Sequence, residues 1–444
     1  MAIPFLVLTG AVIVGAMAYA YSRSRDSTHP MVFFGLLLLY VYAFRPVTLA
    51  YYGVLQEWFS ADRLLHVVLF RLASVSLFCL GCIYGVSRYS RQMSRQRPVL
   101  RVSPGFRGRA YMAGAILGML GMLSFLYVLF IERGGLTETF SSPYAFKMAS
   151  SGYLFESRWL GGPAVLMLAF ARRGQRLRIQ DIVLAICLLS PLWLPGVLGA
   201  KRGPSFYALC VVAFAYFVWR ERRPTILQLA GVLGAAGVVA IFLVLNRSDI
   251  YIGSSFHLDF SSVFGYLFKA ENIARDEEFI SSGGAFLTAE RFGRYGWGAL
   301  WVVMFVIRPI PRQIWPTKYE DCGFDWLLQP PGQGMFGYSN VEWMEAAGFQ
   351  PAYGCAYGFE TDFFLEFSWG SLIFCYLLGL LFAWMWKRER AGGGLAQIVL
   401  ITSLALAVYL PTQGAVQYFF FWSAAIIPTV IMWRFFVQPP SRAG

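Results

Sequence analysis

Eleven apolar stretches, each about as long as a membrane-crossing helix, constrain this chain more than any other feature. A helix rises about 1.5 Å per residue, so about 20 apolar residues cross the hydrocarbon core of a bilayer. The chain is therefore predicted to be an all-α, polytopic integral membrane protein. We predict spans near residues 3–21, 31–52, 64–87, 110–131, 152–171, 179–199, 204–220, 226–245, 364–386, 394–411 and 417–436.

The overall composition agrees with a membrane protein. Only 14% of the 444 residues are charged and 57% are hydrophobic, whereas a soluble chain carries about 25% charged residues. The first apolar stretch has no basic segment before it. We therefore interpret it as a span and not as a cleavable signal peptide.

The charges in the connecting loops predict which way the chain crosses the membrane. Alternate loops are strongly basic, and one side of the predicted topology collects 21 basic residues but only four acidic ones. The positive-inside rule assigns that side to the cytoplasm. The N-terminus is then external and the C-terminus cytoplasmic. The net charge of +13 is explained by this topology, so no nucleic-acid partner is predicted.

The predicted spans divide the chain into three parts. Residues 1–245 form a bundle of about eight spans, residues 246–363 form a large external loop, and residues 364–444 form a bundle of about three spans. The loop contains an apolar run, 297–307, that is too short to cross a bilayer. We expect a re-entrant or interfacial segment near 297–318.

Cysteine and histidine spacing predicts no metal site and no cofactor. The three histidines, His29, His66 and His257, have no metal-ligand spacing. Cys322 and Cys355 both fall in the external loop. A disulfide between them is expected if that compartment is oxidising.

Several cations lie at positions where a charged side chain is energetically costly in a membrane protein. Arg45 and Arg71 lie within predicted spans, and Lys201 and Arg202 lie in a turn that must be external. Charges at membrane depth mark functional sites. These side chains predict an anionic ligand, and the alternative is a structural ion pair with a carboxylate of the large loop.

A second basic segment lies within the external loop. Arg308, Arg312 and Lys318 alternate with three prolines, which prevent a regular helix and stiffen the backbone. Guanidinium groups match phosphate oxygens. We predict that these cations, together with Arg45, Arg71 and Arg202, gather around a pyrophosphate held at headgroup depth. Trp315 suits either the membrane interface or stacking on a sugar.

Carboxylates lead into the ninth predicted span. Glu360 and Asp362 are expected at the membrane surface and Glu366 just inside it. Glu360 or Glu366 could serve as the general base for a sugar hydroxyl, as could His257. The alternative is that an acid pairs with one of the arginines and holds the basic cluster in place.

Three motifs resemble those of the Wzy-type oligosaccharide repeat-unit polymerases of bacterial O-antigen and exopolysaccharide pathways. They are the turn Gly199–Gly203, the segment Ile310–Lys318 and the stretch Thr361–Gly370. The motifs cover about thirty residues, whereas the likeness in architecture covers most of the chain. Tyr319 departs from the family pattern, which has proline after the lysine.

The resemblance implies a GT-C-like, inverting, metal-independent glycosyltransferase in the bacterial inner membrane. Its substrates would be undecaprenyl-pyrophosphate-linked oligosaccharides, and a polysaccharide chain-length regulator is a candidate partner. Arg202 and Arg312, followed by Lys318, match positions of the family motifs. Two alternatives are an O-antigen ligase, which would depend on a loop histidine such as His257, and a lipid-linked oligosaccharide flippase or transporter.

Overall fold

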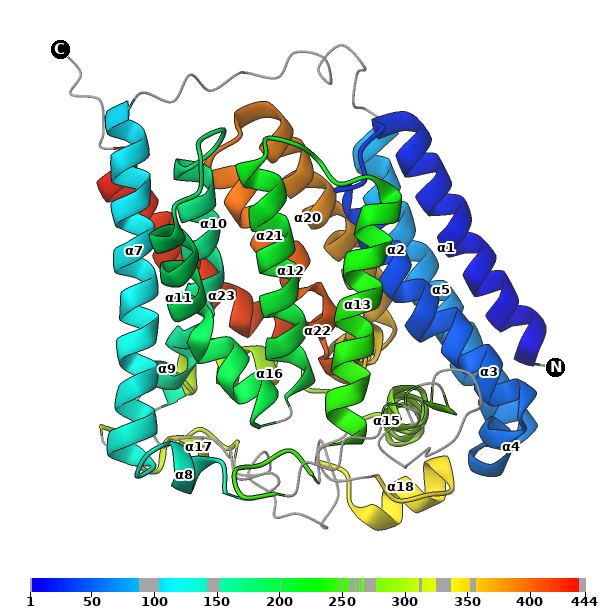
Figure 1. The fold of residues 1–444 in the computed structure, drawn as a ribbon. Helices are drawn as coiled ribbons and strands as arrows, with labels where there is room; N and C mark the ends of the chain where they lie inside the picture. Colours follow the sequence, from blue (N-terminus) through cyan, green and yellow to red (C-terminus); the bar gives the residue numbers. More distant parts are fainter. Residues whose placement is uncertain are drawn as a thin grey trace.

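The computed structural model shows a bundle of long helices with short helices gathered at one end (Figure 1). The structure describes residues 2–87, 104–141, 152–199, 201–246, 249–254, 260, 263, 265–266, 277–310, 314–324, 337–351 and 357–438. These residues contain helices and no β-strand, so the predicted all-α fold is confirmed for this part of the chain.

Ten of the predicted spans form helices, or helices in direct succession, that are long and apolar enough to cross a membrane. They are α1 (Ala2–Ser24), α2–η1–α3 (Pro30–Leu38, Leu39–Phe44, Arg45–Tyr51), α5 (Ala61–Ser87), α7–η2 (Pro104–Tyr127, Val128–Glu132), α11 (Ile179–Val197), α12 (Arg202–Trp219), α13 (Ile226–Leu245), α19–η6–α20 (Phe359–Phe367, Ser368–Gly370, Ser371–Gly392), α21–η7–α22 (Leu395–Ala405, Leu406–Val408, Tyr409–Gln413) and α23–η8 (Ala415–Met432, Trp433–Val437).

The remaining predicted span, 152–171, is not one continuous α-helix. It forms α9 (Gly152–Glu156), the 3-10 segment η3 (Ser157–Leu160) and α10 (Gly161–Ala171). Pro163 has no N–H to donate to the carbonyl of Trp159, so regular α-helical hydrogen bonding is interrupted there. All residues of α10 are buried. This segment is therefore an interior element of the bundle.

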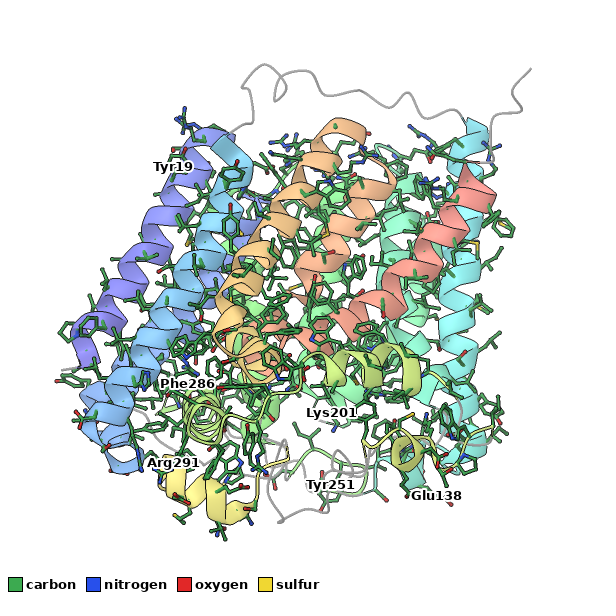
Figure 2. The ribbon with its side chains drawn as sticks, turned by 180° about the vertical axis from the view of Figure 1, so that it is seen from behind. Tyr19, Glu138, Lys201, Tyr251, Phe286 and Arg291 are labelled. Atoms are coloured by element: carbon green, nitrogen blue, oxygen red, sulfur yellow. The ribbon has the colours of Figure 1, made fainter. Side chains whose placement is uncertain are left out.

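The short helices lie at the end of the bundle that carries the large loop. Figure 1 shows them below the long helices, and Figure 2 labels Lys201, Tyr251 and Arg291 at the same end. The start of α1 lies towards the end with the short helices, and the last described helix, drawn in red, ends towards the opposite end (Figure 1). The short helices are α4 (Val54–Trp58), α8 (Leu136–Thr139), α15 (Glu278–Phe292), α16–η4 (Ala299–Val302, Val303–Ile307), α17 (Lys318–Asp321) and α18 (Asn340–Ala347).

The apolar run predicted at 297–307 forms α16–η4. Trp301 of this segment stacks on Phe363 of α19, with ring centroids 6.2 Å apart. The segment therefore packs against the start of the ninth predicted span. Whether it enters the membrane stays a prediction.

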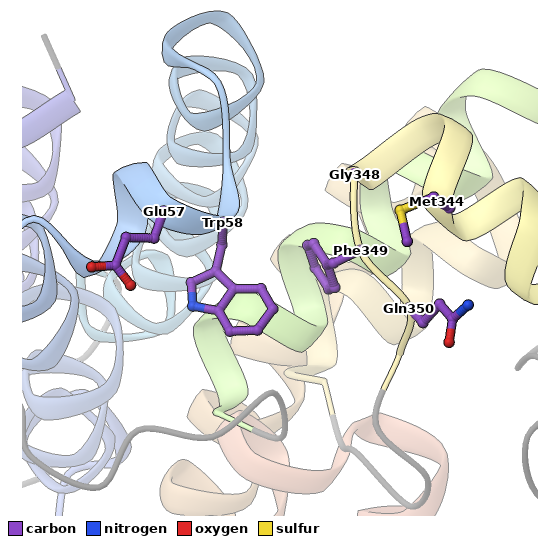
Figure 3. Close-up of a pocket in the computed structure, with 6 residues that line it drawn as sticks. All are labelled: Glu57, Trp58, Met344, Gly348, Phe349 and Gln350. Carbon is purple, nitrogen blue, oxygen red and sulfur yellow. The ribbon is translucent and has the colours of Figure 1, made fainter.

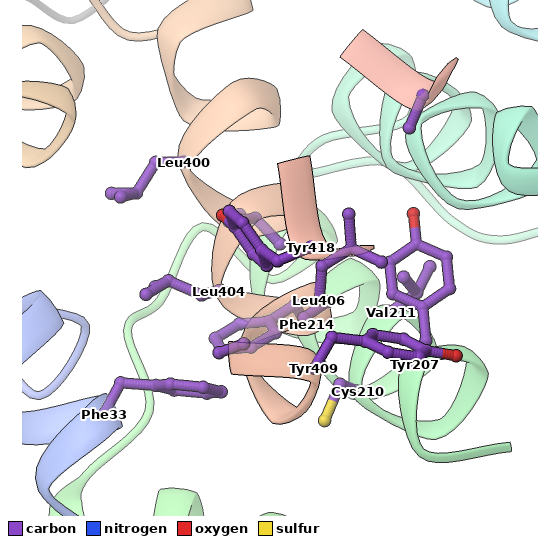
Figure 4. Close-up of a cluster of buried hydrophobic side chains, with 14 of the residues drawn as sticks. Phe33, Tyr207, Cys210, Val211, Phe214, Leu400, Leu404, Leu406, Tyr409 and Tyr418 are labelled. Atoms are coloured by element: carbon purple, nitrogen blue, oxygen red, sulfur yellow. The ribbon is translucent and has the colours of Figure 1, made fainter. Parts of the chain in front are cut away.

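The early and late spans share one core. An ideal Cβ on Gly81 of α5 would lie 2.9 Å from the backbone nitrogen of Leu380 in α20, so this glycine lets the two helices approach closely. A large buried cluster joins Phe33 and Phe214 from early helices to Leu404 and Tyr418 from late ones (Figure 4). The two predicted bundles thus pack into one.

Candidate functional site

Three of the predicted cations converge on the first turn of α15, although they come from three different spans. The Arg45 Nε lies 3.6 Å from the Glu277 Oε1, and the Arg202 Nη1 lies 2.6 Å from the Glu278 Oε1. Arg71 donates from Nη2 to the Glu278 carbonyl at 3.4 Å. We call these five residues the arginine cluster. It lies at the end of the bundle that carries the large loop.

Local backbone structure explains how Arg45 reaches this cluster. The residue follows η1, a π-helical turn, and Pro46 after it lacks the N–H of a regular helix. Such wide turns occur often at functional sites. The guanidinium of Arg45 lies 4.2 Å from the ring of Tyr266 and donates to the Tyr266 carbonyl at 2.5 Å.

Arg71 is joined to Glu360, one of the predicted candidate bases. The Arg71 Nε lies 3.6 Å from the Glu360 Oε1, and the Tyr42 hydroxyl donates to the same carboxylate. Glu360 is completely buried. Its geometry in the described structure therefore favours the alternative considered above, an acid that holds an arginine in place.

Arg202 is the most accessible arginine of the cluster, with 36% of its side chain exposed, whereas Arg45 is 4% exposed. It begins α12, and the preceding Lys201 donates its backbone N–H to the Gly196 carbonyl at 2.9 Å. A ligand at this end of the bundle could reach Arg202 without rearranging the core.

Arg308 belongs to a second group of charges and not to the arginine cluster. Its Nη2 and the Nη2 of Arg158 each lie 3.7 Å from the Glu156 carboxylate. Trp159 donates its indole N–H to the same carboxylate at 2.7 Å. Sequence reasoning missed Arg158 and Glu156, although two charges inside a predicted span were a usable signal.

Lys318 is buried under its own segment. Its ammonium group donates to the carbonyls of Ile307, at 3.0 Å, and of Arg308, at 3.1 Å, as well as to Ile310. These bonds tie the turn after η4 to α17. Trp315 is half-buried and donates to Asp321 at 2.5 Å. In this structure, the side chain of Lys318 therefore stabilises the backbone of its own segment.

Three residues that the sequence analysis singled out lie outside the described part of the chain. Arg312 and Cys355 are not among the described residues, and His257 is not either. The role predicted for Arg312 and the disulfide predicted between Cys322 and Cys355 therefore stay predictions.

The acids after Glu360 hold backbone segments. The Glu366 Oε2 accepts the Gly298 N–H at 2.7 Å, which fixes the start of α16. The Asp362 Oδ2 accepts the Val416 N–H at 2.8 Å and so caps α23. An ideal Cβ on Gly414 would lie 2.7 Å from Asp362 Oδ2, and the φ of Gly414 is +109°. Only glycine adopts this turn without strain.

Glu277 is an acid that the sequence analysis did not single out. It is 6% exposed, and its carboxylate accepts the N–H groups of Phe279 and Ile280 at the start of α15. Burial, together with the neighbouring Glu278, raises the pKa of Glu277 to about 7. A carboxyl with a pKa near the working pH suits a general base. The two adjacent acids, Glu277 and Glu278, in the predicted loop were the sequence feature that could have indicated this site.

An apolar groove opens beside the arginine cluster on the outside of the bundle. It has a volume of about 420 Å³ and lies between α1 and the α2–η1–α3 span. Phe44 and Val47 line it and lie on either side of Arg45 in the chain. The other lining residues are Leu6, Val7, Leu36, Leu39, Tyr40 and Ala43.

A pocket of about 410 Å³, lined by both polar and apolar side chains, lies between α4 and α18 (Figure 3). The rings of Trp58 and Phe349 meet edge to face with centroids 5.3 Å apart, and Glu57 and Gln350 add polar groups. An ideal Cβ on Gly284 of α15 would lie 2.7 Å from the Phe349 ring. Because Gly284 follows Glu277 by seven residues of helix, the pocket wall lies about 10 Å along α15 from the cluster.

Comparisons with known proteins identify no relative of this chain. No protein-family model, curated protein or solved structure matches the chain. Within the described residues, no group of three or more His, Cys, Asp or Glu side chains could hold a metal ion. The described helices therefore define the class, a polytopic α-helical protein with ten candidate membrane spans, and the site alone must indicate a function.

Proposed function

We propose that this chain is a membrane glycosyltransferase that polymerises lipid-linked oligosaccharide repeat units at the outer face of a bacterial inner membrane. The growing glycan would leave its undecaprenyl pyrophosphate carrier and join a new lipid-linked unit. The observation that carries the proposal is the convergence of Arg45, Arg71 and Arg202 on the first turn of α15.

The surroundings of the arginine cluster suit a lipid diphosphate. Guanidinium groups and the positive end of a helix both favour phosphate oxygens. The apolar groove is lined by Phe44 and Val47, which lie on either side of Arg45 in the chain, and it lies between two spans. A polyprenyl chain in that groove would keep its diphosphate at the depth of Arg45 and Arg202.

The proposed reaction follows from these positions. The hydroxyl oxygen of the acceptor sugar attacks the anomeric carbon of the donor, and the bond from that carbon to the diphosphate oxygen breaks. Glu277 accepts the proton of the hydroxyl. The diphosphate leaves with its electron pair, and Arg202 stabilises the developing charge after exchanging Glu278 for the ligand.

The proposal is tested with Arg202→Ala in cells that depend on this chain for polymer. Removing one preorganised donor at a developing charge costs about 10²-fold or more in rate. We expect polymer to disappear while single repeat units accumulate on the lipid carrier.

The matched control is Arg291→Gln. This arginine lies at the same end of the bundle, is 49% exposed and pairs with Glu345 on the surface. Polymer of normal length and amount from Arg202→Ala would contradict the proposal. Loss of polymer from both variants would point to a general effect of charge at this end.

A further inference from the structure

A groove of about 630 Å³ opens at the end of the bundle opposite α15. It lies among α20, α21, α23 and η8, which belong to candidate membrane spans. Trp384 on its wall is 59% exposed. Most of its wall is apolar and includes Leu381, Trp384, Val399, Ile426 and Val430.

Two arginines stand at the groove. Arg388 and Arg434 both line it and both are exposed. Neither side chain has an ion-pair partner within the described part of the chain. Two like charges beside an apolar wall make this end of the groove electrostatically favourable for an anion.

The acids at this end of the bundle cannot supply that anion, because each is already paired. Asp26 contacts Arg223 and Arg390, and Glu389 contacts Arg223. The other two acids at this end are likewise held by arginines, Asp181 by Arg172 and Glu221 by Arg173. An anion that neutralises Arg388 and Arg434 would therefore come from outside the described residues.

Two further features of the groove favour an anionic, polar-headed occupant. Trp433 lines it at 1% exposure, and its Nε1 has no hydrogen-bond partner among the described residues. The turn Gly393–Gly394 and the first residues of α21 also line it. The N-terminal end of this 11-residue helix adds a positive dipole end.

We propose that this groove binds an anionic phospholipid of the adjacent leaflet. The phosphate and headgroup would lie between Arg388 and Arg434, and the acyl chains would cover the apolar wall between α20 and α23. A zwitterionic lipid would neutralise the arginines poorly, and a free phosphate would leave the apolar wall uncovered. The site lies at the opposite end from the arginine cluster and does not depend on the proposed function.

The test is native mass spectrometry of the purified full-length protein with phosphatidylglycerol or phosphatidylcholine of the same acyl chains. We expect preferential retention of phosphatidylglycerol. Arg388→Gln and Arg434→Gln should each lower this preference about fivefold, the usual worth of one basic side chain near an anionic lipid surface. Val430→Trp should abolish retention by filling the groove while both arginines remain.

The matched control is Arg176→Gln, which removes one exposed charge from the same end of the bundle away from the groove. Its preference for phosphatidylglycerol should equal that of the unchanged protein. Equal retention of the two lipids would overturn the proposal. The same loss in Arg176→Gln as in Arg388→Gln would also overturn it, because the effect would then be one of net charge.

Discussion

Three buried arginines of this bundle each lie close to a carboxylate. Arg45 meets Glu277, Arg71 meets Glu360 and Arg158 meets Glu156. A buried ion pair gains little over apolar packing, because desolvation offsets the attraction. The pairs of Arg45 and Arg71 therefore suggest a role other than stability, and the proposed binding of phosphate would be such a role.

At this scale, the proposed role of Glu277 as a general base predicts how activity depends on pH. A general base works only when it is deprotonated, and burial raises its pKa to about 7. Activity in isolated membranes should therefore rise as pH increases through about 7. Glu277→Gln should lose both the activity and this step in the pH profile.

The control for Glu277 is Glu345→Gln, which changes an exposed acid of α18. It should keep the full pH profile. An unchanged pH step in Glu277→Gln would assign the base to another group.

Gly203 allows a second prediction at the scale of one residue. A Cβ at this position would overlap the Tyr409 hydroxyl. Overpacking of this kind costs about 1–3 kcal/mol. Gly203→Ala should lower the melting temperature in detergent, and Tyr409→Phe in the same chain should restore part of it.

Gly231 is the matched control, because an added Cβ there meets nothing within 4 Å and the residue lies inside α13. Gly231→Ala should hold or raise the melting temperature, since alanine favours helices. Equal losses in the two variants would mean that the contact with Tyr409 does not constrain the turn.

At the scale of elements, one ionic network joins three helix ends. Asp26, between α1 and α2, contacts Arg223 from the turn before α13 and Arg390 from the end of α20. Trp386 donates its indole N–H to the same carboxylate at 2.8 Å. Segments distant in sequence are thereby held together at the basic end of the bundle.

Asp26→Asn should destabilise the bundle by about 3 kcal/mol or more, because it leaves two partly buried arginines without that charge. Burial favours a higher pKa, but Arg223 and Arg390 hold the pKa of Asp26 well below its usual value. Such a carboxyl stabilises the fold above its unfolded pKa of about 4. Its contribution is lost only as pH falls through the lower folded pKa.

Thermal unfolding between pH 8 and pH 5 should therefore show a constant difference between Asp26→Asn and the unchanged protein. The difference should shrink below about pH 4. Asp62→Asn, at an exposed position of α5, should stay within about 0.5 kcal/mol. A difference that disappears already at pH 6 would contradict the assigned network.

At the scale of the whole molecule, the two ends of the bundle differ in structure and charge. One end gathers the basic turns, and the other carries α15, α16, α17 and α18 (Figure 1). The positive-inside rule predicts that the end with the short helices is external. The proposed reaction requires the same orientation.

Cysteine labelling tests this orientation in intact cells. In a background with Cys322 and Cys355 replaced by serine, Val341→Cys should react with a membrane-impermeant maleimide, because Val341 is 75% exposed on α18. Arg176→Cys should react only after the cells are opened. The reverse pattern would invert the topology and remove the basis for an external active site.

Much of the helical architecture could be predicted, and less of the site. Spans such as 226–245 were recognisable because apolar length is a local property. The position of Arg71 in a span was equally visible, but its contact with the Glu278 carbonyl joins residues 207 positions apart. No local pattern specifies such a contact. Lys318 and Glu366 show the same limit, because the contacts of their buried charges with backbone atoms could not be predicted from the sequence.

The sequence by itself determined the class of protein and ten segments that are long and apolar enough to cross a membrane, because transfer of apolar residues into a bilayer depends on their type and run length. It also determined which turns are basic. Only the tertiary structure decided that Arg45, Arg71 and Arg202 share the first turn of α15, and that Arg308 does not. The reason is that side chains from separate spans meet only through helix packing, and packing depends on the whole set of interior surfaces at once.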